Sequence, residues 1–148
     1  MLIREIEANL PWGFHDAYLE RLAVDWTRGT AQLDLRVMMS EHQDLDQLGR
    51  LSLLGLAYIA AEPPSKAIGE CCEAGLWVDS EEVIAQSGGG TTIQLPATYF
   101  LHRFYVHSTE SSIYVCAREA SYEWIEESPS NARAQSRALF PGERLQPR

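Results

Sequence analysis

Residues 18–39 contain two runs in which apolar and polar side chains alternate, and this pattern constrains the fold more than any other in the chain. In the second run one side carries Ala31, Leu33, Leu35, Val37 and Met39. A period of two is that of a half-buried β-strand. Between the runs, Gly29 can take positive φ without steric cost, as a short hairpin connection requires. We predict an antiparallel hairpin whose apolar face needs a covering layer.

A second hairpin is expected near the other end of the chain. Residues 99–107 and 112–125 are rich in aromatic side chains, and the polar segment 108–111 turns the chain between them. Residues 50–61 read as one apolar strand, residues 75–79 as a short strand, and residues 1–10 favour an edge element. Together these signals predict a mainly β fold, an antiparallel β-sandwich or open barrel of about six strands with little helix.

The length of 148 residues is that of about one domain. We predict a single β domain over residues 1–127 and an irregular, Arg-containing tail over residues 128–148. The formal net charge is −9. The tail holds four Arg and one Glu, a balance of +3, so residues 1–127 carry −9 − 3 = −12.

Composition excludes several function classes for the folded body. Binding a nucleic acid depends on Lys and Arg neutralising phosphates, so an acidic body predicts no nucleic-acid partner. No run reaches the 18 apolar residues of a membrane span, which predicts no membrane insertion. An odd number of cysteines, three, and an N-terminus without an uninterrupted apolar segment favour a reduced, cytoplasmic setting.

The histidines are the main candidates for chemistry. His15 and Asp16 are residue types that act as a base or bind a metal, although Asp16 is also suited to accepting backbone hydrogen bonds at a turn. His102 and His107 are five positions apart, so on a regular strand they point to opposite faces. Because neither completes a zinc motif, we predict no catalytic residue, no metal and no cofactor.

Three further motifs indicate ordinary surface or core. Residues 41–46 read as a solvated acidic loop, since they lack the glycine and the distal glutamate of an EF-hand. Cys71 and Cys72 lack the C-x-x-C spacing of a redox pair, and Cys116 reads as a small core residue. Residues 87–90 share only their glycines with a phosphate loop.

Aromatic side chains in the second hairpin outnumber those that one face can bury. Either another layer covers them, or some form a binding surface or dimer seam, where Tyr and Trp are enriched. The leading hypothesis is a non-enzymatic interaction module that binds another protein or itself. The alternative is a small-ligand-binding protein or enzyme whose pocket is lined by Trp12, Phe14, His15, Asp16, Trp77 and His102.

Five short segments resemble those of small bacterial proteins of uncharacterised function. They are G-F-H-D-A (13–17), L-A-V-D-W (22–26), E-P-P (62–64), G-L-W-V-D (75–79) and A-S-Y-E-W (120–124). The resemblance implies a shared fold over most of residues 13–125 and transfers no catalytic residue. A looser similarity to acidic immunity proteins that neutralise bacterial toxins rests on size and charge, and implies an acidic patch around Glu41, Asp44 and Asp46.

Overall fold

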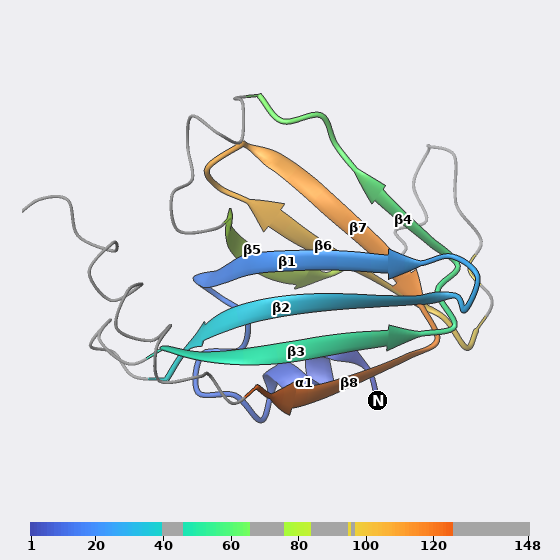
Figure 1. Cartoon of the computed structure of the whole chain (residues 1–148), viewed down its shortest axis with the longest axis horizontal. Coiled ribbons are helices and arrows are strands. Elements are labelled where there is room, and N and C mark those ends of the chain that lie inside the picture. The colour runs from blue at the N-terminus through green and yellow to red at the C-terminus, as the bar shows by residue number, and fades with distance from the viewer. Residues whose placement is uncertain (40–45, 66–75, 84–94, 96, 126–148) are drawn as a thin grey trace, which may run out of the picture.

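The computed structural model describes residues 1–39, 46–65, 76–83, 95 and 97–125, which form one antiparallel sheet and a short helix (Figure 1). Eight strands lie in the order β4-β7-β6-β5-β1-β2-β3-β8, and the sheet is not closed into a barrel. The prediction of a mainly antiparallel β domain with little helix is confirmed. The elements are α1 (Ile3–Glu7), β1 (Ala17–Asp25), β2 (Thr30–Met38), β3 (Asp46–Leu54), β4 (Tyr58–Ala61), β5 (Leu76–Glu82), β6 (Phe100–Val106), β7 (Ser111–Ala117) and β8 (Glu119–Trp124).

The predicted first hairpin is present as β1 and β2. Gly29 adopts φ +61° in the connection, which is the conformation for which a glycine was expected there. The expected apolar face of β2 is buried, with Leu33, Leu35 and Val37 all fully inaccessible to solvent. Strand β2 therefore presents its apolar side to the core, as its period of two predicts, whereas the register of β1 shifts between Leu19 and Arg21 and its Leu22 is exposed.

Two of the expected long strands are each bent into two shorter ones. The run 50–61 becomes β3 and β4, bent at Gly55, and the run 112–125 becomes β7 and β8, bent at Arg118. Backbone hydrogen bonds from Arg118 to Leu54 (3.1 Å) and from Ala57 to Cys116 (2.8 Å) hold the two bends together. Gly55 has φ +63°, a conformation that side-chain-bearing residues rarely adopt, and a Cβ there would lie 2.5 Å from Arg118 Nε, so that the Arg118 side chain would have to move. Six expected runs thus give eight strands.

The sheet curls around Phe14. Strands β6 and β8 are five inter-strand spacings apart in the sheet order, a separation of roughly 24 Å in a flat sheet. Yet the Phe14 ring lies 6.5 Å from the Phe104 ring on β6 and 5.5 Å from the Tyr122 ring on β8. Phe14 is fully buried, and Ile3 and Ile6 of α1 join the same core. The inner face of the sheet is thus filled by the N-terminal segment.

The N-terminal segment differs from the edge element favoured by the sequence. Residues Ile3–Glu7 form one short helix, α1, whose two isoleucines point into the core. Its neighbour in the fold is β8 (Figure 1), and the Ala120 N–H of that strand donates to the Met1 carbonyl at 2.8 Å. Because Ile3 and Ile6 are three residues apart, a helical turn places both on one side, which a strand could not do.

The outer face of β1, β2 and β3 carries a lattice of ion pairs. Arg50 donates two hydrogen bonds to the Asp34 carboxylate, at 2.7 and 3.1 Å, which lower the pKa of Asp34. Beside it, Arg36 contacts Glu20 at 2.7 Å and Asp46 at 3.1 Å. These charges largely neutralise one another, so the acidic surplus of the chain lies elsewhere.

Several predictions concern residues outside the described part of the chain: the tail 128–148, most of the acidic segment 41–46, Cys71 and Cys72, and the glycine run 87–90. Cys116 is described and is buried, as expected for a core residue. Among the described residues, no helix has the length and apolar character needed to cross a membrane.

Candidate functional site

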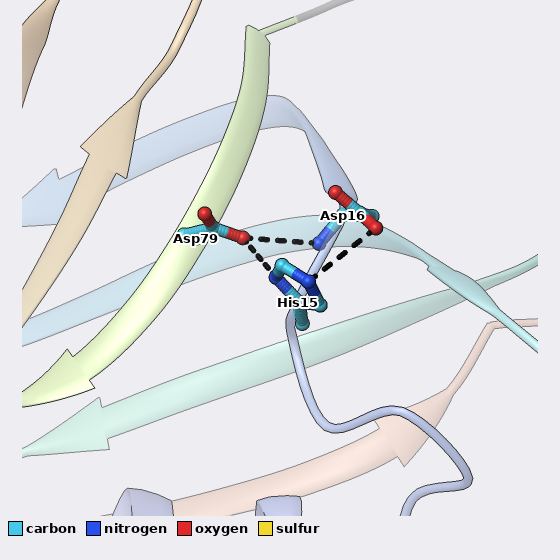
Figure 2. A group of neighbouring side chains, drawn as sticks. All are labelled: His15, Asp16 and Asp79. Atoms are coloured by element: carbon cyan, nitrogen blue, oxygen red, sulfur yellow. Dashed lines mark hydrogen bonds and ion pairs between the residues drawn. The ribbon is translucent and has the colours of Figure 1, made fainter.

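Strand β5 continues past the start of β1, and this offset creates a site. Ala17, the first residue of β1, pairs with Val78, so β1 offers no strand partner to the next residue, Asp79. The loop residues His15 and Asp16 lie there instead (Figure 2). His15, Asp16, Trp77 and His107 surround Asp79, and these five residues are called the Asp79 cluster.

Both carboxylate oxygens of Asp79 accept a hydrogen bond from an imidazole. His15 Nδ1 contacts Asp79 Oδ1, and His107 Nε2 lies 2.6 Å from Asp79 Oδ2. The Asp16 backbone N–H also faces Oδ1, at 3.4 Å. Asp79 therefore joins the loop before β1 to the end of β6, two segments far apart in the sequence.

Asp16 is held by the same arrangement. Its Oδ1 accepts a hydrogen bond from the indole nitrogen of Trp77 at 3.0 Å, and its Oδ2 lies 3.6 Å from His15 Nε2. Asp16 also has φ +58°, a left-handed conformation that Asp tolerates better than most residues. The loop therefore presents one carboxylate oxygen bonded to Trp77 and the other directed at His15.

The electrostatics of the cluster follow from these contacts. The hydrogen bond to Asp79 raises the pKa of His15, against a smaller opposing effect of burial, and the charges of Asp79 and Asp16 add to the rise. Partial burial by itself raises the pKa of Asp79, but the hydrogen bonds from His107 and His15 outweigh it and lower the pKa overall. The cluster therefore favours a cationic imidazole beside an ionised carboxylate.

A row of aromatic rings continues from the cluster along the outer face of the sheet. Ring centroids lie 5.9 Å apart between Tyr18 and Trp77, 6.1 Å between Trp77 and His107, and 5.0 Å between His107 and Tyr105. The Arg103 guanidinium lies 5.2 Å from the Tyr105 ring centroid at the far end. Trp77 is 39% exposed, so the row, called the ring row and made of Tyr18, Trp77, His107 and Tyr105, reaches the surface.

His102 lies on the opposite face of the sheet. It is 1% exposed, shares a hydrogen bond with the Ser80 hydroxyl, and packs on Phe104 with ring centroids 5.1 Å apart. Burial lowers the pKa of His102 to about 4, so this imidazole is neutral near pH 7. The expected orientation of His102 and His107 toward opposite faces is what the structure shows.

Of the six residues expected to line a pocket, three come together and two lie in the core. His15, Asp16 and Trp77 meet in the Asp79 cluster. Phe14 and His102 are buried on the inner face, and so are not available to a ligand at the surface. Trp12 is 42% exposed, and its backbone carbonyl accepts a hydrogen bond from the His15 N–H at 3.2 Å.

Sequence reasoning missed Asp79 as the centre of the site, and missed His107 as its partner. The signal was present in G-L-W-V-D, because a period of two places Trp77 and Asp79 on one side of a strand and Val78 on the other. Nothing in the sequence states that His15 and His107 would reach that side, since this depends on the offset between β5 and β1.

The chain matches no protein-family model, and no curated protein matches it either.

Proposed function

We propose that this domain is a non-enzymatic binding module that recognises another protein through the ring row and the adjoining Asp79 cluster. The observation that carries the proposal is the continuous series of ring contacts from Tyr18 to Tyr105 on the outer face, with Trp77 39% exposed at its centre. Exposed Trp and Tyr side chains combine a large apolar area with a polar group, and they dominate the binding energy of protein interfaces.

The rigidity of the row supports the same proposal. Trp77 is fixed at its indole nitrogen by Asp16, and His107 is fixed at Nε2 by Asp79. Side chains that are already held in place lose less conformational entropy when a partner binds. The row is therefore preorganised as a contact surface.

Charge suggests the chemistry of the partner. The chain has a net charge of −9, and the charged groups of the ion-pair lattice on β1–β3 are paired with one another. A partner with a basic surface therefore fits this molecule better than one with an acidic surface. Neutralisation of a basic toxin is one case of such binding. A toxin would be bound by an acidic patch around Glu41, Asp44 and Asp46. Glu41 and Asp44 lie outside the described residues, and Asp46 is paired with Arg36. The ring row is thus the better-supported surface, and a cytoplasmic setting remains part of the proposal.

A matched pair of tryptophans tests the proposal. A photo-crosslinking amino acid placed at Trp77 samples the ring row, and the same group at Trp26, 65% exposed on the β1–β2 connection, is the control. We expect a discrete covalent product, from a partner or from a second copy, at position 77 and not at position 26. Its yield should fall as salt rises if the partner is basic.

Affinity for the captured partner completes the test. Truncating an aromatic anchor at the centre of an interface costs about 2 kcal/mol or more, roughly 30-fold in affinity. Trp77→Ala should therefore weaken binding by that factor and Trp26→Ala should not. Equal crosslinking at both positions, together with a monomer at every concentration in light scattering, would exclude the ring row as an interface.

A further inference from the structure

We propose that His15, Asp16 and Asp79 form a binding site for a divalent first-row transition-metal ion, of which Zn²⁺ is the representative. The three side chains each offer one ligand atom, and these atoms all lie within 4.8 Å of one another. The site lies within the Asp79 cluster, but the proposal does not depend on the protein contact and can be tested on the purified protein alone.

The donor set decides the class of metal. One imidazole nitrogen with two carboxylate oxygens is a mixed nitrogen and oxygen set, which zinc and its neighbours accept. Calcium and magnesium favour sites made wholly of oxygen atoms. The imidazole of His15 thus points away from those two ions.

The surrounding contacts are of the kind that orient metal ligands. Asp16 Oδ1 accepts the Trp77 indole N–H at 3.0 Å, which leaves Oδ2, the oxygen nearer to His15, for the ion. Asp79 Oδ2 accepts from His107 Nε2 at 2.6 Å, whereas Oδ1 contacts His15 Nδ1, so an ion held by Oδ1 and His15 takes the place of the proton between them. Each carboxylate therefore has one oxygen bonded to Trp77 or His107 and the other directed at His15. Hydrogen bonds of this kind to metal ligands typically change metal affinity 10- to 100-fold.

The site is open on one side. The His15 side chain is 63% exposed, and those of Asp16 and Asp79 are 35% and 32% exposed. An ion can reach the three ligands without rearrangement of the core, and water or a partner side chain can complete its coordination. His102 takes no part, since it lies on the inner face against Ser80.

Titration calorimetry with Zn²⁺ on untagged protein tests the proposal. We expect one ion per chain. Asp79→Asn and His15→Gln should each weaken binding at least tenfold, because each removes one ligand atom. Asp25→Asn, at the opposite end of β1 and paired only with Arg28 among the contacts described, is the matched control and should bind as the parent does.

The role of His107 gives a sharper measurement. Because His107 contacts Asp79 and belongs outside the ligand set, His107→Gln should weaken Zn²⁺ binding less than His15→Gln while leaving the stoichiometry at one. Bound Co²⁺ should show visible absorption bands that His15→Gln alters and Asp25→Asn does not. Circular dichroism establishes that each variant is folded.

The proposal fails if the parent protein binds no Zn²⁺ at millimolar concentration. It also fails if folded His15→Gln and Asp79→Asn variants bind Zn²⁺ as tightly as the parent, since the ion would then sit elsewhere. Neither result would affect crosslinking at Trp77, so failure of the metal site and failure of the protein contact are distinguishable.

Discussion

Asp79 and Ser80 are consecutive residues of β5 that contact histidines on opposite faces of the sheet. Ser80 points inward and contacts His102, which is 1% exposed, whereas Asp79 points outward and contacts His15 and His107. The inward imidazole is kept neutral by burial, and the outward His15 is favoured as a cation by a carboxylate. The position of a histidine relative to the sheet therefore decides its charge, and with it the task that the residue can perform.

The largest expected effect comes from removing the inward histidine. His102→Ala leaves a cavity beside Phe104 and an unpaired Ser80 hydroxyl, so we expect the free energy of unfolding to fall by about 2–4 kcal/mol. His107→Ala, on the outer face, should cost less than about 1 kcal/mol. Urea denaturation of both variants measures the difference. Equal losses would contradict the assignment of the two residues to core and surface.

Acidification should destabilise the protein through His102. The unfolded imidazole has a pKa near 6.5 and the folded one a pKa of about 4, so below pH 6.5 the unfolded state binds the proton first. The His102 contribution should be constant above pH 6.5, and should reduce the free energy of unfolding by about 3 kcal/mol on reaching pH 4. The measurement is the difference between the parent and His102→Leu as a function of pH. If the free energy of unfolding of the two proteins had the same pH dependence, the destabilisation through His102 would be contradicted.

On the inner face, the stability of the fold depends on whether a buried polar group has a hydrogen-bond partner as well as on its burial. His102 has Ser80 as partner, whereas the Tyr122 hydroxyl has none within the described part of the chain, and burial raises the pKa of Tyr122. Tyr122→Phe removes the unpaired oxygen and keeps the ring on Phe14, so we expect the protein to be more stable by about 1 kcal/mol. Thermal unfolding of the parent and of Tyr122→Phe shows whether the substitution raises or lowers the stability. A loss of stability would mean that the hydroxyl has a partner.

The smallest effect is expected in the Asp79 cluster, and its pH dependence has the opposite sign. Asp79 raises the pKa of His15, so that pair stabilises the fold below the unfolded pKa of about 6.5, and this contribution is lost as pH rises through the folded pKa. Because His15 is exposed, the contribution should be below about 1 kcal/mol. Asp79→Asn should remove it. A larger loss of stability at pH 9 than at pH 5 would contradict the assigned direction.

The same comparison shows how far the sequence determines this fold. Alternation along residues 18–39 and the glycine at 29 were sufficient to predict the first hairpin, because both signals are local. The spacing of His102 and His107 was sufficient to place them on opposite faces. The bends at Gly55 and Arg118 were not predicted, since residues 50–61 and 112–125 each read as one continuous strand, and the positive φ of Gly55 and the backbone contact between the two bends explain them.

The candidate site was predicted in part, for a physical reason. His15, Asp16 and Trp77 were chosen by residue type, and they do meet. Phe14 was chosen with them but points inward, because the chain crosses from the inner face to the outer face between Phe14 and Asp16. Asp79 was missed because its contacts depend on where β1 begins: Ala17 pairs with Val78, so the loop before β1 lies beside Asp79. Local periodicity does not encode the register between two strands about 60 residues apart in the sequence.

An NMR titration of the histidine ring protons tests the central claim most directly, namely that His102 on the inner face is kept neutral and His15 on the outer face is favoured as a cation. The signals are assigned by substituting His15, His102 and His107 in turn. The account predicts that His102 titrates near pH 4 and His15 above 6.5. His102 and His15 titrating together near 6.5 would contradict it, because both imidazoles would then be in water.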